Sequence, residues 1–284
     1  MPRMKTLRIS ALNIVTHPHS KASYISLLQR AHQLRVAAKY FGNHLGVIGA
    51  FNEYYKTGAY MGTIHQFTDV DFQKPWLDLQ TGEAASESAV RSITLPSNLK
   101  PEFKSTPFVF LPDRHRMFFA SEQLGPTSAQ KLVSRILSNE NVCKGISEIH
   151  VNIEQDARSL KELFSIPGLS LIEIRINRPN PDDIGGAESR IMKRLQALHA
   201  RSMQESFTGS PGETLEPDSE IRDLAKVALS NGRVDVKGRD EDNLVVAKSS
   251  IERPLSHRVR FDTSTQTEFD ELFSFGQSFE GRTD

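Results

Sequence analysis

The stretch STPFVFLPDRHRMFFASEQLGPTSAQKLVSRIL, residues 105–137, is the clearest supersecondary unit of the chain. Apolar residues flank the turn LPDRH on both sides, a pattern that predicts a β-hairpin; they are Phe108, Phe110, Met117 and Phe119. The segment GPTS then opens a helix with apolar residues at helical spacing, namely Leu132, Val133, Ile136 and Leu137. Lys131 and Arg135 are expected to project outward from this helix, so the unit predicts a hairpin covered by an amphipathic helix.

A second unit follows, with a strand on each side of a short helix. Isoleucine and valine alternate with polar residues in EIHVNIE, residues 148–154, and again in LIEIRINRP, residues 171–179. Between them, ARSLKELFSI has helical spacing and ends at Pro167-Gly168. Downstream, two more amphipathic helices are expected in residues 185–203 and 220–232, with strands in RVDVKG, NLVVAKSS and HRVRFD.

Upstream of the hairpin, the sequence predicts a strand in TLRISALNI, a helix in SKASYISLLQRAHQLRVAAKY, two further strands and a long loop over residues 78–104. These patterns together predict an α+β fold with two lobes of mixed, mainly antiparallel sheet and packed helices. The expected N-terminal lobe covers residues 1–140 and the C-terminal lobe residues 141–262. Residues 263–284 are polar, acidic and rich in phenylalanine, and we expect a disordered acidic tail.

Composition places the chain among ordinary globular proteins. Its 284 residues are 38% hydrophobic and 25% charged, and no stretch approaches the roughly 20 apolar residues of a membrane span. The N-terminus lacks the apolar region of a secretory signal, and the single cysteine, Cys143, rules out an intrachain disulfide. We expect a soluble, cytoplasmic protein.

The net charge of zero hides an uneven distribution of basic residues. Residues 1–60 hold eight Lys or Arg against one acid, whereas residues 191–284 hold 17 acids against 13 bases. Such asymmetry is typical of a face that binds a polyanion, although the same residues would also suit a solvated surface. The candidate nucleic-acid-binding residues are Arg190, Lys193, Arg194 and Arg201 on one side of a helix, Lys131 and Arg135 on another, and Lys21 and Arg30 near the N-terminus. They predict contact with phosphates and little sequence preference.

A metal-dependent nuclease is an alternative interpretation. In RVDVKGRD, residues 233–240, Asp235 and Lys237 form the acid-x-lysine pair that such enzymes place on a strand, and Asp223 would be the second acid. Asp223, however, is expected on a helix, and GRDEDN has the composition of a turn between two strands. An exposed hairpin is therefore the favoured interpretation.

No other motif commits the chain to a reaction. His17 and His19 in THPHS could share a metal, and Asp69 and Asp71 could do the same, but neither pair has a third ligand at suitable spacing. The glycine-rich phosphate-binding motifs and the G-x-S-x-G nucleophile motif are absent from the sequence. We predict no catalytic residue, no cofactor and no metal.

The order of elements over residues 105–260 resembles a family of bacterial proteins of unknown function. It is also similar to the RexA family, the Rex exclusion proteins of lambdoid prophages, in which a strand, a GPT turn and a helix precede a strand–helix–strand unit and a late hairpin. The resemblance implies a homodimeric, non-enzymatic DNA-binding protein that senses phage infection and acts with an effector partner, typically in the membrane. The resemblance assigns no functional role to any individual residue of this chain.

The leading prediction is therefore sequence-tolerant binding of nucleic acid, DNA more than RNA, by a homodimer in antiviral defence. A third interpretation is a protein-interaction module, in which the tail segment EFDELFSF, residues 268–275, docks a partner as a short acidic helix.

Overall fold

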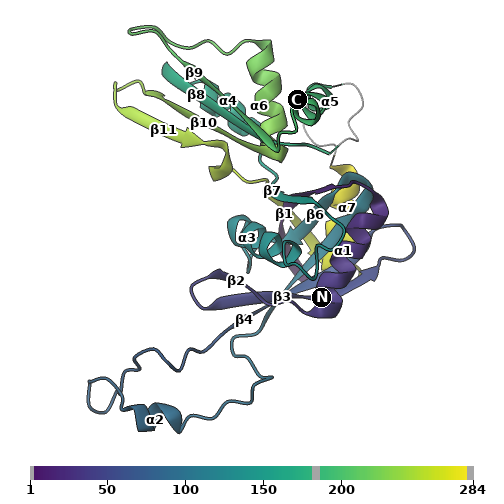
Figure 1. Ribbon diagram of the computed structural model, residues 1–284, viewed down its shortest axis with the longest axis vertical. Coiled ribbons are helices and arrows are strands. Elements are labelled where there is room, and N and C mark those ends of the chain that lie inside the picture. Colours follow the sequence, from purple (N-terminus) through teal and green to yellow (C-terminus); the bar gives the residue numbers. More distant parts are fainter. Residues whose placement is uncertain (1–2, 181–185, 280–284) are drawn as a thin grey trace.

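The computed structural model describes residues 3–180 and 186–279 and shows an α+β protein built on two antiparallel sheets (Figure 1). The expected fold class is confirmed. Every strand pair among the described residues is antiparallel, so the sheets are not mixed.

The first sheet has eight described strands in the order β12-β1-β6-β5-β4-β3-β2, with β7 also paired to β1. Their bounds are β1 (Met4–His17), β2 (Ala38–Phe41), β3 (His44–Glu53), β4 (Tyr60–Thr68), β5 (Lys104–Leu111), β6 (Arg116–Ala120), β7 (Glu148–Ile153) and β12 (His257–Asp262). Strand β1 is the axis of this sheet, because it pairs with β12, β6 and β7 in turn. Both of its faces are buried from Ile9 onward, as expected for a strand covered on two sides.

The predicted hairpin is confirmed as β5 and β6, with Phe108 opposite Phe119 and Phe110 opposite Met117. These four side chains are fully buried under two helices, α1 (Lys21–Leu34) and α3 (Pro126–Leu137). The inward residues of α3 are those that the helical spacing predicts, and Lys131 and Arg135 are exposed. The hairpin turn contains a single 3₁₀ turn, η1 (Pro112–Arg114).

The expected disordered tail is wrong for its central part, residues 268–278. Residues Glu268–Ser278 form a helix, α7, which packs on β5 and β6 on the face of the sheet opposite α1 and α3. Leu272 is fully buried there, beside Phe118 and Phe261. Thr267 and Asp270 form a capping box that satisfies the first free amides of this helix. Residues 280–284 lie outside the described residues.

The second sheet has the order β11-β10-β8-β9. Its strands are β8 (Gly168–Asn177), β9 (Ser202–Thr208), β10 (Gly232–Arg239) and β11 (Val245–Ser249), and its helices are α4 (Arg158–Phe164), α5 (Ala187–Ala197) and α6 (Ser219–Asn231). One face of the sheet is apolar, with Ile172, Ile174 and Val234 packed against Ala225 and Ala228 of α6. The strands, α4, α5 and α6 therefore form a C-terminal lobe with its own core.

The strand pairing places the boundary between the lobes after Ile153, whereas the sequence predicts it near residue 140. Strand β7 belongs to the first sheet, and the chain leaves that sheet after Ile153 and returns to it with β12. A second 3₁₀ turn, η2 (Ser250–Glu252), precedes this return. The N-terminal lobe therefore contains β7, β12 and α7 in addition to residues 1–140.

A long excursion between β4 and β5, residues 69–103, extends from the N-terminal lobe on the side away from the C-terminal lobe (Figure 1). We call it the arm. Its base is closed by a hydrogen bond from the Thr68 amide to the Pro101 carbonyl at 3.0 Å and by a Lys100–Asp69 ion pair at 2.6 Å. It contains one short helix, α2 (Glu87–Arg91).

None of the helices within residues 3–180 and 186–279 is both long and apolar enough to span a bilayer.

Candidate functional site

Basic side chains gather where α1, α3 and β2 meet. We call this the α1–α3 cationic surface, and it consists of Arg30, Arg35, Lys39, Lys131, Arg135 and Lys144. Two hydrogen bonds hold it together: Arg30 Nη1 donates to the Lys144 carbonyl at 2.9 Å, and Arg135 Nη1 donates to the Lys39 carbonyl. Because α3 also packs on β2 and on α1, the elements that carry these cations are neighbours.

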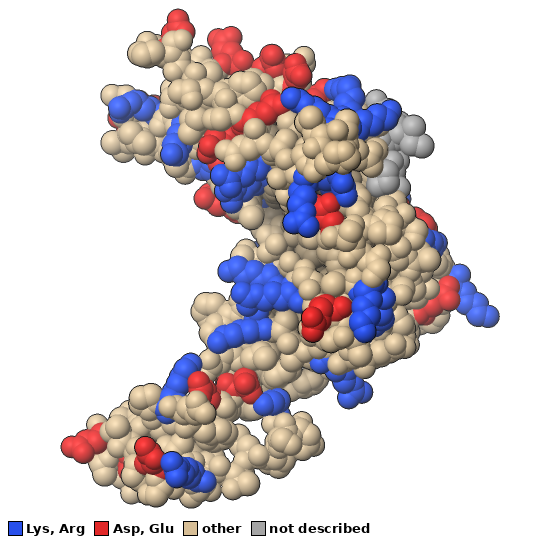
Figure 2. Space-filling model, in the orientation of Figure 1, with Lys and Arg blue, Asp and Glu red and all other residues tan. Residues whose placement is uncertain are grey.

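No carboxylate among the described residues forms an ion pair with any of these six side chains. Figure 2 shows Lys and Arg side chains gathered over α3, on the flank that is hollowed between the C-terminal lobe and the arm. Unpaired guanidinium and ammonium groups on one face raise the local potential and attract anions.

His65 on β4 is close enough to respond to this potential. Its pKa is lowered, chiefly by burial and then by the positive charges of Arg35 and His32. A histidine whose proton is disfavoured by neighbouring cations is what a positively charged surface predicts.

The other predicted basic residues are placed differently. Lys21 forms an ion pair with Asp113 at 3.0 Å, so its charge is partly neutralised. Arg190 and Lys193 are exposed on α5 of the C-terminal lobe, where neither forms an ion pair with another described residue.

Arg194 and Arg201 both face carboxylates. Arg194 lies 3.7 Å from Glu205, and Arg201 lies 3.9 Å from Glu148, a buried acid that also binds Arg178 at 2.8 Å. No hydrogen bond or ion pair between described residues links these arginines to the α1–α3 cationic surface. Of the eight predicted residues, Lys131, Arg135 and Arg30 therefore belong to the α1–α3 cationic surface. Arg190, Lys193, Arg194 and Arg201 lie on the C-terminal lobe, and Lys21 belongs to neither group.

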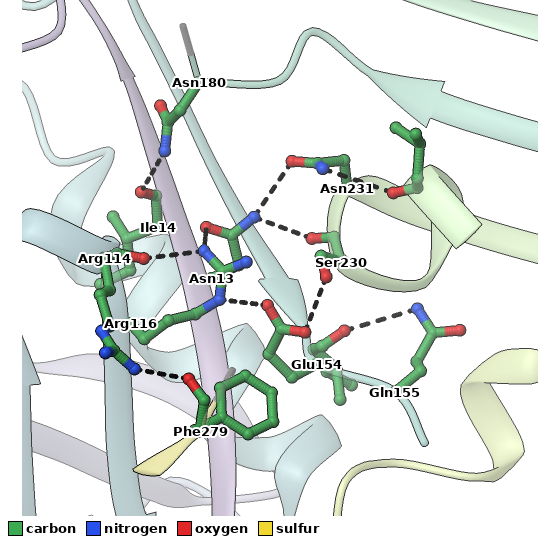
Figure 3. A network of polar contacts seen from close by, with 12 residues as sticks. Asn13, Ile14, Arg114, Arg116, Glu154, Gln155, Asn180, Ser230, Asn231 and Phe279 are labelled. Carbon is green, nitrogen blue, oxygen red and sulfur yellow. Dashed lines mark hydrogen bonds and ion pairs between the residues drawn. The ribbon is translucent and has the colours of Figure 1, made fainter. Parts of the chain in front are cut away.

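A buried polar network joins the two lobes (Figure 3). Arg116 on β6 forms an ion pair with Glu154, just after β7, and donates from Nη1 to Asn13 Oδ1 at 2.8 Å. Ser230 Oγ donates to the other oxygen of Glu154 at 2.7 Å. Asn13 Nδ2 then donates to the Ser230 carbonyl and to Asn231 Oδ1, each at 3.0 Å. The C-terminal end of α6 is thereby fixed against β1.

A small cavity of about 250 Å³ adjoins this network, bounded by both lobes. Near it, Tyr24 donates to Asn180 Oδ1 at 2.9 Å, and the Tyr24 ring lies 4.9 Å from the ring of His115. The charged groups around the cavity already have partners: Asp113 pairs with Lys21, Glu188 accepts from the Asn231 side-chain amide, and Arg114 donates to the Gly276 carbonyl at 3.0 Å. This arrangement suits a rigid connection between the lobes better than a reactive centre.

The three residues of the nuclease alternative are not brought together. Asp235 points away from α6, because its neighbours Val234 and Val236 face the helix-covered core. It binds Arg233 at 2.8 Å and accepts from Ser249 Oγ at 2.5 Å. Asp223 lies on α6, across the sheet, and pairs with Lys226 at 3.8 Å. Within the described part of the chain, no three His, Cys, Asp or Glu side chains are placed to hold a metal ion.

His17 and His19 take separate structural positions. The His19 ring contacts the rings of Tyr24 and His115, with Nδ1 2.9 Å from the Tyr24 hydroxyl. His17 is buried at the end of β1, and its pKa is lowered first by burial and then by the charge of Arg178.

The lowered pKa of His17 predicts a pH dependence of stability. Above the ordinary histidine pKa the residue is neutral in both folded and unfolded chains. As the pH falls below that value, the unfolded chain gains the proton more readily, so the folded state loses stability until the pH passes the folded pKa. In urea denaturation at pH 7 and pH 5, we expect the wild type to lose more stability than His17→Gln. Equal losses in the two proteins would contradict this role.

Lys144 and the residues of the buried polar network are not predicted as functional or structural sites from the sequence. Lys144 lies in the irregular segment after α3, where no periodicity points to a common face. The network residue Asn13 carries a faint signal, since it interrupts an apolar run and a buried polar residue in a strand needs a partner. Glu154 carries none, because it occupies a polar position of the alternating pattern in EIHVNIE.

Comparison with known proteins gives one family. No curated protein matches the chain, and no match is to a Rex exclusion protein. The model of a family described as a domain of unknown function, DUF4747, matches residues 5–276. The expected relation to a family of unknown function is thus confirmed, and the chain belongs to the DUF4747 family.

Proposed function

We propose that this protein binds nucleic acid without catalysis, through phosphate contacts made by the α1–α3 cationic surface. The observation that carries the proposal is the cluster of six cations from α1 and its C-cap, β2, α3 and the segment after α3, none of which forms an ion pair with a described carboxylate. Phosphates neutralise such a cluster and release condensed counterions, so binding depends strongly on salt and little on sequence. Arg190 and Lys193 on α5 would add a second, separate set of contacts.

DNA is the preferred partner in this proposal, and RNA the second choice. That preference comes from the resemblance in element order to the Rex exclusion proteins, as does the extension to antiviral defence. In that role, the DNA-bound protein would sense phage infection and signal to an effector protein, for example one in the membrane.

Charge reversal at Lys131 and Lys144 tests the surface. Neither side chain forms an ion pair with a described residue, so Lys131→Glu/Lys144→Glu leaves the fold's own contacts in place. We expect duplex DNA to bind about 100-fold more weakly at moderate salt, and the slope of log affinity against log salt to fall by about two. Salt titrations on duplex DNA, single-stranded DNA and RNA, read by gel shift, measure both quantities.

A matched control reverses two exposed arginines on the edge strand β12, Arg258→Glu/Arg260→Glu. This variant changes the net charge by the same amount away from the surface and is expected to keep most of the affinity. Equal losses of affinity in the two variants would show only a general charge effect. If Lys131→Glu/Lys144→Glu bound DNA as tightly as the wild type, the α1–α3 cationic surface would not be part of the DNA-binding site.

A further inference from the structure

The arm exposes apolar side chains that no other described part of the chain covers. Seven of the fifteen exposed large hydrophobic residues among the described residues lie within its 35 positions: Phe72, Leu77, Leu79, Ile93, Leu95, Leu99 and Phe103. Leu79 is 88% exposed, the highest value of the fifteen. Apolar residues concentrated on a projecting segment indicate a surface that binds another protein.

The tip of the arm is ordered by its own contacts. The Asp78 amide donates to the Glu83 carbonyl at 2.9 Å, the Gly82 amide to the Asp78 carbonyl at 2.8 Å, and the Ala85 amide to the Trp76 carbonyl at 2.7 Å. Trp76 in turn stacks on Phe72 with centroids 5.6 Å apart. A tip that is already shaped loses little entropy when it docks.

The arm is also acidic, with six acidic against three basic residues. Its three bases each pair with an arm acid: Lys74 with Asp71, Arg91 with Glu87 and Lys100 with Asp69. Asp78 and Glu83, beside the exposed leucines of the tip, have no cationic partner among the described residues. The tip therefore presents two exposed leucines beside two carboxylates that have no cationic partner among the described residues.

A groove of opposite character lies on the C-terminal lobe, between α4 and α6. Its volume is about 480 Å³, within the range of about 300–1,000 Å³ typical of binding pockets. Leu160, Phe164 and Leu229 supply its apolar surface. Every charged residue that lines it in the described chain is basic, namely Arg158, Lys161, Arg222 and Lys226. Arg158 pairs with Asp156 at 2.6 Å and Lys226 with Asp223 at 3.8 Å, whereas Lys161 and Arg222 form no ion pair with another described residue.

We propose that the occupant of this groove is the arm tip of a second copy of the chain. Leu77 and Leu79 enter the apolar part, and Asp78 and Glu83 meet the basic rim. Within one chain the arm extends away from the C-terminal lobe (Figure 1), so the exchange takes place between copies. Two copies that each insert an arm into the other's groove form a closed, two-fold dimer in which both interfaces are identical.

A charge swap tests the exchange. The groove variant is Lys161→Glu/Lys226→Glu and the arm variant is Asp78→Lys/Glu83→Lys; all four side chains lie on the surface. Each variant alone juxtaposes like charges at both interfaces and is expected to dimerise about 100-fold more weakly than the wild type. Mixed in equal amounts, the two variants form a heterodimer in which both interfaces again pair opposite charges, and its affinity is expected to return to near the wild-type value.

Sedimentation velocity over the micromolar range measures the dimer affinity of the wild type, the two variants and their mixture. Thermal melts followed by circular dichroism verify that each variant folds. Leu244→Ser removes an exposed leucine outside both surfaces and is expected to leave the dimer unchanged, whereas Leu79→Ser is expected to weaken it. A monomeric wild type, or variants that do not restore each other, would overturn the proposal. These measurements contain no nucleic acid, so their outcome is independent of the proposed DNA binding.

Discussion

Replacing Arg116 with Met is expected to lower the free energy of unfolding by about 3–5 kcal/mol, because the buried carboxylate of Glu154 loses its cationic partner. The Glu154 side chain is 3% exposed and that of Arg116 is 15% exposed, so water cannot solvate the orphaned charge. The same change removes the hydrogen bond to Asn13 Oδ1, and with it one of the contacts that link β6 to β1 beside the C-terminal lobe. Urea denaturation gives the loss directly.

A double-mutant cycle separates the buried charge from general damage. Glu154→Gln keeps an acceptor for Ser230 Oγ while removing the charge, so Arg116→Met should cost markedly less in the Glu154→Gln background than in the wild type. If the cost of Arg116→Met is the same in both backgrounds, the ion pair is not what stabilises this junction.

Leu272→Ala is expected to destabilise the protein by about 2–5 kcal/mol, the usual cost of a cavity left by a buried leucine. Leu272 is fully buried between α7 and the sheet, in the cluster that contains Leu7, Phe118 and Phe261. If α7 were instead a free recognition segment, this substitution would have almost no effect on stability. Thermal or urea unfolding distinguishes the two cases.

The control for Leu272→Ala lies on the same helix. Ser274 is exposed on α7, and Ser274→Ala should change stability by less than about 0.5 kcal/mol. A loss below about 1 kcal/mol for Leu272→Ala would contradict the docked position of α7 and revive the interpretation of this segment as a free docking helix.

The hairpin and its covering helix are predictable because their signals are local. Phe108, Phe110, Met117 and Phe119 alternate around one turn, so the pairing partner of each strand is its neighbour in sequence. Lys131 and Arg135 follow from the same reasoning, since a helix that buries Leu132 and Ile136 must expose the positions on its other side. Local periodicity therefore predicts both a part of the core and a part of the cationic surface.

The other parts of the fold and of the cationic surface depend on contacts between residues that are distant in sequence. Strand β12 has a strand pattern, yet nothing in HRVRFD shows that it pairs with β1, some 250 residues away. The composition of α7 predicts a tail because its charged and polar residues outnumber its apolar ones. A helical signal is nevertheless present, since Phe269, Leu272, Phe273 and Gly276 follow helical spacing after a capping threonine. Likewise Arg30 and Lys144 come together only through the packing of α1 beside α3.

The position of β12 and α7 has a consequence for synthesis on the ribosome. Residues 156–253 are inserted between two strands of the first sheet, and their sheet and helices are nearly contiguous in sequence. This inserted lobe can complete its core while translation continues. The first-formed strands, by contrast, have their outer face covered only after residues 257–278 have emerged, which leaves Leu7 and Phe118 accessible to chaperones in the meantime.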